Sequence, residues 1–261
     1  MKYSLLILAA IGVLSNSSCT KVIDIDLNKS NPQYVIEGEV TNAHASQTIH
    51  ITRSVNFSDD NQFPGVVNAV VILSDDAGNR DTLVQDQPGY YSTDKIKGIP
   101  GRTYNLEILV DNHTFYASSR MPEPVVIDTV TMVERSSFGK QIKAPVVSFH
   151  ERKGTGHYYY FMVYRNHQRV KTIYIDNDQA NDGTIIERFL QYADSSYNSG
   201  DKVCVDLQSI TKEVYEYYFS LQQTIGQSSA TPANPITNIS GGNALGYFSA
   251  HTADRRKLTV Q

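Results

Sequence analysis

The acidic stretch DNDQANDGTIIE, residues 176–187, is the part of this chain that most resembles a metal-binding pattern. Its carboxylates stand at positions 1, 3, 7 and 12 of a calcium-type loop: Asp176, Asp178, Asp182 and Glu187. Such oxygen ligands suit Ca²⁺, but the pattern also requires Asp or Asn at position 5 and Gly at position 6. Ala180 and Asn181 stand there instead, between flanks that alternate like strands. We therefore predict a solvated acidic loop and no metal site.

Other catalytic patterns are absent from the sequence. The seven histidines are scattered, and no HExxH, GxSxG, phosphate-binding loop or Rossmann glycine motif occurs. His150 and Glu151 are adjacent, so their side chains would point to opposite faces of a strand. Cys204, flanked by two valines in KVCVDL, is expected to be an inert buried thiol. We therefore expect a protein that is not an enzyme and has no cofactor.

The aromatic segment HYYYFMVY, residues 157–164, offers both a packing surface and a stacking platform. In a strand, Tyr158 and Tyr160 would face one side, and Tyr159 and Phe161 the other. Aromatic platforms bind sugars, but a strand that is apolar on both faces is typical of a central strand covered on both sides. Core packing is the favoured interpretation.

The N-terminus carries the order of a secretory signal peptide. Lys2 precedes a ten-residue apolar run, residues 5–14, which is too short to cross a bilayer. Small polar residues then lead into Cys19, where a lipidation signal would end, although Asn16 stands where Leu is usual. We predict a signal peptide over residues 1–18 and lipidation of Cys19. The alternative is an ordinary signal peptide cleaved near the same place.

Lipidation would attach the protein to a membrane without a spanning helix. One acyl chain anchors only marginally, whereas a diacylglyceryl group with a further chain, such as palmitate, holds firmly. Residues 19–33 are polar and would form the tether. Thr20 replaces the aspartate that favours retention in the inner membrane, so we expect an outer-membrane lipoprotein in either leaflet.

The charge balance excludes one class of partner. The whole chain has 23 basic and 27 acidic side chains, and removing Lys2 with the signal peptide changes the net charge from −4 to −5 (22 minus 27). Nucleic-acid binding requires clustered Lys and Arg on one face. We expect no nucleic-acid partner.

The remaining chain predicts a mainly β fold built from two sandwiches. Short strands and turns fill residues 34–121, an N-terminal β-sandwich similar to immunoglobulin-like and transthyretin-like domains. Pro122 and Pro124 favour a boundary, after which residues 125–261 form a C-terminal β-sandwich.

One segment of the second half breaks the strand pattern. Within about residues 209–226, apolar side chains recur at spacings of three and four: Ile210, Val214, Tyr218, Leu221 and Ile225. This spacing predicts one amphipathic α-helix near the C-terminal end. Packing against a sheet is the favoured interpretation, and a peripheral partner-binding helix is the alternative.

Several ordered stretches together resemble one family of Bacteroidota lipoproteins, domain of unknown function 4249 (DUF4249). They include YVIEGEVTN, the NAVVILSDD–GYYS–GIPGRTYNLEI block, MPEPVVIDTV, HYYYFMVYRN, ITKEVYEYYFSL and NPITNISGGNALGYFSA. The family usually ends in Gly-Gly-x-Gly-x-Phe, and here Asn243 and Ala244 lengthen that loop. The resemblance implies an outer-membrane lipoprotein often encoded beside TonB-dependent receptors. It implies no catalytic residues.

These observations favour an accessory lipoprotein that binds a ligand or a TonB-dependent receptor and supports nutrient uptake. A structural or adhesive surface lipoprotein without a small-molecule ligand is the alternative. An enzyme acting on glycans or peptides is the third and least favoured hypothesis. It would need acid and base carboxylates that converge in a cleft.

We predict that Cys19→Ala abolishes incorporation of a labelled fatty acid, because the thioether that carries the lipid can no longer form. Metabolic labelling of the wild type and the variant measures this directly. Equal labelling of the two proteins, or an unmodified Cys19 thiol in the native protein, would contradict the lipid anchor.

Overall fold

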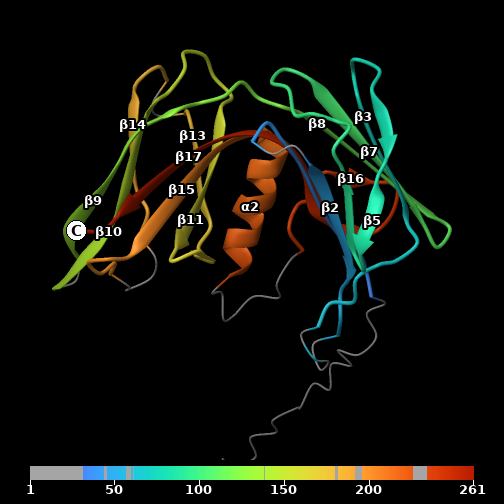
Figure 1. The fold of residues 1–261 in the computed structure, drawn as a ribbon, viewed down its shortest axis with the longest axis horizontal. Coiled ribbons are helices and arrows are strands. Elements are labelled where there is room, and N and C mark those ends of the chain that lie inside the picture. The colour runs from blue at the N-terminus through green and yellow to red at the C-terminus, as the bar shows by residue number, and fades with distance from the viewer. Residues whose placement is uncertain are drawn as a thin grey trace, which may run out of the picture.

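A computed structural model describes residues 32–43, 46–56, 60, 62–137, 139–179, 182–191, 196–225 and 234–261. The predicted signal peptide, Cys19 and most of the tether lie outside these residues. The described chain is mainly β with one helix, as the sequence predicted (Figure 1). None of its helices is both long enough and apolar enough to span a membrane.

The strands form three sheets. A nine-stranded sheet has the order β12-β11-β15-β17-β1-β2-β6-β5, with β13 also paired to β11. Its strands are β1 (Tyr34–Thr41), β2 (Gln47–Arg53), β5 (Val84–Gln87), β6 (Tyr90–Thr93), β11 (Tyr158–Arg165), β12 (Gln168–Arg169), β13 (Tyr174–Asn177), β15 (Lys202–Ile210) and β17 (Ala244–Thr259). The five-stranded sheet contains β16 (Ile239–Ser240), β8 (His113–Arg120), β7 (Thr103–Val110), β3 (Val70–Asp75) and β4 (Arg80–Thr82). The three-stranded sheet contains β14 (Ile185–Phe189), β10 (Lys140–His150) and β9 (Ile127–Ser137).

The long strand β17 belongs to both halves of the molecule. Its first half pairs in parallel with β1, from Tyr34↔Ala244 to Thr41↔His251. Its second half pairs antiparallel with β15, from Ser209↔Thr252 to Lys202↔Thr259. Figure 1 shows β17 running from one half of the molecule into the other. The two predicted sandwiches, residues 34–121 and 125–261, therefore share one continuous sheet.

Two of the three hydrophobic clusters among the described residues lie between this continuous sheet and the smaller sheets. The first core is enclosed by the β17–β1–β2–β6 part and the five-stranded sheet, and its buried side chains include Ile36, Leu106 and Phe248. The second core is enclosed by the β11–β15 part and the three-stranded sheet, and includes Phe149, Phe161 and Val205. Since β16 and the first half of β17 contribute to the first core, the N-terminal sandwich takes its last strands from the end of the chain.

The helix α2 (Lys212–Thr224) lies within the predicted range of about residues 209–226 and is shorter at both ends. Thr211 caps it, because its side chain accepts a hydrogen bond from the Val214 amide. Val214, Tyr217 and Tyr218 are buried against the large sheet. The helix therefore packs over β11 and β17 between the two halves, as Figure 1 shows.

A cluster of tyrosines joins α2 to the sheet. Tyr218 stacks on Tyr160 of β11, with ring centroids 4.2 Å apart, and Tyr217 contacts Tyr247 of β17 at 4.9 Å. The Tyr247 hydroxyl donates to Glu39 Oε1 at 2.9 Å. Burial raises the pKa of Tyr247 well above its usual value. The aromatic strand β11 is thus core on both faces, with Tyr160 under the helix and its other face in the second core.

We predict that Gly246→Ala destabilises the protein more than Gly78→Ala does. Both glycines have positive φ angles, +101° and +87°, which cost an L-residue about 1–2 kcal/mol. A Cβ on Gly246 would also lie 2.0 Å from the Ile36 carbonyl oxygen in the β17–β1 pairing, whereas a Cβ on Gly78 meets open space. Urea unfolding of the two variants measures the difference. Equal losses of unfolding free energy would contradict this prediction. They would mean that the β17–β1 pairing can shift to accommodate the added Cβ.

Candidate functional site

The four carboxylates that have the spacing of a calcium loop, weak candidates by sequence, do not converge on one point. Asp176 forms an ion pair with Arg188, and the Asp182 carboxylate accepts from the Gly154 amide at 2.8 Å. Asp178 is buried and accepts from the His157 amide at 2.9 Å. Glu187 is exposed on β14. Asp176, Asp178 and Asp182 therefore have separate partners. Among the described residues, Asp178 is grouped with Glu151 and His157 and not with the other three carboxylates.

A different group of titratable side chains does come together: Glu151, His157 and Asp178. The ligand-capable atoms of these three residues lie within 4.8 Å of one another. His157 Nδ1 is 2.7 Å from Glu151 Oε1 and 3.6 Å from Asp178 Oδ2. Two ligands of one tetrahedral zinc lie about 3.3 Å apart, so a metal would have to separate His157 from Glu151. As it stands, the group is a hydrogen-bonded cluster of one imidazole and two carboxylates.

The Glu151 cluster is buried and oriented by its neighbours. The Glu151 side chain is fully buried, and Tyr159 donates its hydroxyl hydrogen to Glu151 Oε1 at 2.7 Å. Burial, and then this hydrogen bond, raise the pKa of Tyr159 well above its usual value. Nδ1 of His157 faces the carboxylates, so the contacts with them fix the orientation of the imidazole ring. Glu151 and Asp178 therefore orient His157.

Sequence reasoning did not find this cluster. It placed His150 and Glu151 on opposite faces, and indeed His150 Nδ1 contacts Asp128 Oδ2 at 2.6 Å in an exposed position. Glu151 meets its partners only because β11 pairs with β13, where Tyr158 lies opposite Asn177. No spacing in the chain signals that pairing.

His157 also lines a cleft of about 460 Å³ between the two halves. Its walls come from the end of β8, the loop that precedes β11, and the junction of β15 with α2. The cationic side chains that line it are Arg120, Arg152 and Lys212. Tyr158, Ile210 and Pro122 add apolar surface. Such a mixed lining and volume are typical of small-molecule sites.

Two polar groups at this cleft have no hydrogen-bond partner in the described part of the chain. Ser209, on β15, is only 4% exposed, and its Oγ atom is unpaired. The Nε atom of Arg152 is also buried and unpaired. A buried polar group left unpaired costs about 1–3 kcal/mol, so most are satisfied in folded proteins. Ser209 Oγ and Arg152 Nε are exceptions to this rule among the residues that line the cleft.

Serine, histidine and carboxylate occur together here, but they do not form the relay of a hydrolase. A nucleophilic serine is hydrogen-bonded to its general base, and the base to a carboxylate. Glu151 does orient His157, yet Ser209 Oγ makes no hydrogen bond to the imidazole. The hydrogen bond between serine and histidine that such a relay requires is therefore absent from the described residues.

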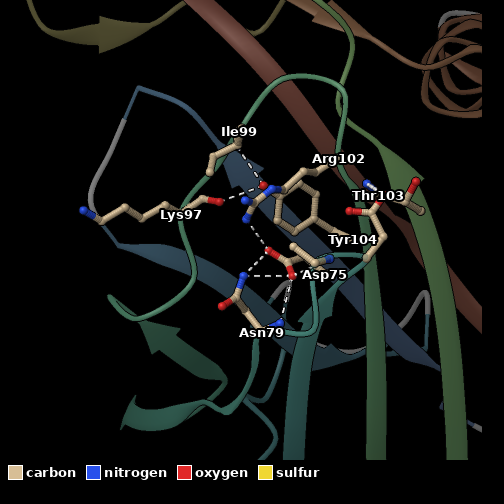
Figure 2. A network of polar contacts seen from close by, with 9 residues as sticks. Asp75, Asn79, Lys97, Ile99, Arg102, Thr103 and Tyr104 are labelled. Carbon is tan, nitrogen blue, oxygen red and sulfur yellow. Dashed lines mark hydrogen bonds and ion pairs between the residues drawn. The ribbon is translucent and has the colours of Figure 1, made fainter.

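One wall of the cleft is fixed by a buried aspartate network (Figure 2). Asp75, at the end of β3, accepts from Arg102 Nη1 and Asn79 Nδ2, each at 2.8 Å. Tyr104 accepts from the Ile99 amide and donates to the Lys97 carbonyl, both at 2.7 Å. These contacts hold the loop before β7 in place. At its end, Thr103 lines the cleft.

The opposite face of the large sheet carries a second hollow, of about 560 Å³, lined by Cys204 among others. Cys204 is half-buried rather than buried, and burial raises the pKa of its thiol. A raised pKa keeps the thiol protonated and weakly nucleophilic. The expectation of an inert thiol therefore remains, although its burial is less complete than predicted.

Comparison with known proteins identifies a family over nearly the whole chain. The family model described as "Domain of unknown function (DUF4249)" matches residues 20–257. No curated protein matches the chain. The crystal structure of the chicken CNTN1 FN1–FN3 domains is similar at 15% identity and a TM-score of 0.27. That match covers 68% of this chain and 60% of the CNTN1 chain, less than two thirds of its length.

We predict that Asp75→Asn lowers the free energy of unfolding at pH 7 by about 2 kcal/mol, since a buried charged acceptor is lost. Burial raises the pKa of Asp75, but hydrogen bonds from Asn79, Arg102 and Ala77 outweigh it and hold the pKa below 3.8. A carboxylate whose pKa is lowered in the folded state stabilises the fold above pH 3.8. This stabilisation is lost as the pH falls through the pKa of the folded state.

Urea unfolding between pH 7 and pH 2 therefore gives a difference between wild type and Asp75→Asn that shrinks below pH 3.8. Asp86→Asn, at an exposed position on β5, controls for the loss of one charge. A difference that stays constant across this range would contradict the role of the Asp75 carboxylate.

Proposed function

The chain belongs to the DUF4249 family, as its ordered motifs predicted, and from this premise we propose that it is a lipid-anchored binding protein of the outer membrane. The anchor is Cys19, which follows an apolar run too short to span a bilayer. The tether of residues 19–33 leads from that lipid to β1. The partners are the membrane, through the lipid, and a ligand.

The observation that carries this proposal is the cleft between the two halves. It combines apolar surface with cations and with buried polar groups, Ser209 Oγ and Arg152 Nε, that lack a partner among the described residues. Unpaired buried groups disfavour the free protein, and a ligand that pairs them recovers that loss. The cleft therefore has the composition of a binding site.

The proposed activity is non-catalytic. Acid–base chemistry on glycans requires two carboxylates that face each other across the substrate. Glu213 is the one carboxylate among the residues that line the cleft. Glu151 and Asp178 lie beneath His157 and are hydrogen-bonded there. We therefore favour ligand capture over turnover.

The proposed protein partner is a TonB-dependent outer-membrane receptor, which would take up the captured ligand. The family resemblance implies this partner. A ligand bound in the cleft would be the molecule that the protein delivers to the receptor. An adhesive surface lipoprotein without a small-molecule ligand is the alternative. The two proposals differ in whether a ligand raises the melting temperature.

We predict that mild detergent extraction of tagged full-length protein recovers an outer-membrane barrel in near-stoichiometric amount. Mass spectrometry of the eluate identifies the barrel, and an unrelated tagged lipoprotein of the same membrane is the control. Recovery of the protein alone would contradict the receptor partnership. A melting temperature unchanged by sugars, peptides and amino acids would favour the adhesive alternative.

A further inference from the structure

Cationic side chains outnumber carboxylates on the lining of the cleft. Among the described residues, neither Arg120 nor Arg152 forms an ion pair, whereas Lys212 contacts Glu216 at 3.4 Å. Arg120 is exposed at the end of β8, and Arg152 is half-buried in the loop before β11. Glu213 alone opposes them on the lining. A positive potential therefore remains for a ligand to neutralise.

The start of α2 adds donors to this positive region. Thr211, Lys212 and Glu213 line the cleft, and they are the cap and the first two residues of the helix. The amides of a first helical turn have no acceptor within the helix, and the helix dipole favours negative charge there. Among the described residues, Thr211 Oγ1 accepts from the Val214 amide alone, at 3.5 Å. The amides of Lys212 and Glu213 are therefore available to an anion.

Ser209 supplies the independent evidence that this helix start is a site. It lies two residues before the cap, on β15, and is 4% exposed with an unpaired hydroxyl. The residue lines the same cleft as the helix start. A hydroxyl donates readily to an anionic oxygen, and such bonds are stronger than neutral ones.

The buried cluster beneath the cleft fits this chemistry. Glu151 and Asp178 are acidic residues, but they lie on the Nδ1 side of His157 and are not among the lining residues. The imidazole therefore stands between these carboxylates and the cleft. With Nδ1 held by Glu151, the other nitrogen, Nε2, remains to contact a ligand.

From these four observations we infer that the cleft binds a small molecule through an anionic group, a carboxylate or a phosphate, held between Arg152, Ser209 and the start of α2. Arg120 at the rim attracts the anion, and Tyr158 and Ile210 contact its carbon skeleton. A volume of about 460 Å³ suits a ligand of one or two sugar or amino-acid units. This inference rests on the proposed binding function and names its ligand class.

The test uses probes that share a carbon skeleton and differ in their anionic group. Glucose, glucuronate and glucose 6-phosphate share one ring, and the diamide succinamide and succinate share one chain, with inorganic phosphate alone as a further probe. Binding to the detergent-solubilised full-length protein is measured by calorimetry and thermal shift at constant ionic strength. We expect saturable binding of anionic members, and the preferred member distinguishes carboxylate from phosphate. Higher KCl weakens the binding.

Substitutions at the cleft test which residues bind the anion. Arg152→Met should weaken anion binding about tenfold, which is the usual effect of losing one charge-assisted contact. Ser209→Ala should weaken it less, and Arg120→Met, at an exposed position, serves if Arg152→Met does not fold. Arg80→Met, on the five-stranded sheet, is the matched control and should leave binding unchanged.

Two outcomes overturn the inference. In the first, no anion binds saturably, or anions bind equally to wild type and to the Arg152 and Arg120 variants. In the second, neutral probes bind as well as their charged counterparts, and Ser209→Ala weakens both. The second outcome leaves the binding function intact while removing the anionic ligand, so the two proposals fail separately.

Discussion

The two-sided pairing of β17 is the constraint on which the rest of the structure depends. One strand hydrogen-bonds in parallel to β1 and, further along, antiparallel to β15. Without it, both neighbours would present unpaired amide and carbonyl groups at a sheet edge. Since its first half also supplies Phe248 to the first core, pairing and packing favour the same register. The relative position of the two cores is therefore set by continuous main-chain hydrogen bonding.

The cleft follows from that constraint. Ser119 Oγ on β8 accepts from the Ala250 amide of β17 at 2.9 Å, which brings the end of β8 up to the large sheet. On the other side, β15 pairs with β17 and then leads directly into α2. The strand β17 thus brings residues near 120, 152 and 210 together around the cleft. Binding groups placed on strand ends and a capped helix start are held more rigidly than groups on free loops.

Charge is arranged in layers around this cleft. The buried carboxylates Glu151 and Asp178 face inward, His157 stands over them, and the arginines line the opening. Similar side chains could support metal binding or acid–base chemistry in another arrangement. Here Tyr159 and the His157 amide donate to the two carboxylates, although Glu151 Oε2 has no partner among the described residues. Ser209 and Arg152, by contrast, keep unpaired donors at the cleft. That contrast favours recognition of a negatively charged group.

The sequence by itself determined the mainly β character and the helix before residue 225, because each is a local pattern of polarity repeated over neighbouring residues. The sequence also predicts a lipid anchor at the N-terminus, in residues that the structure does not describe. It did not reveal the Glu151 cluster, and it offered Asp176, Asp182 and Glu187 as partners that the fold keeps apart. Only the tertiary structure decided that the last strand completes the first core and that Arg120, Arg152 and Ser209 share a cleft. Contacts between residues so distant along the chain depend on strand pairing, and strand order leaves no periodic trace in the sequence.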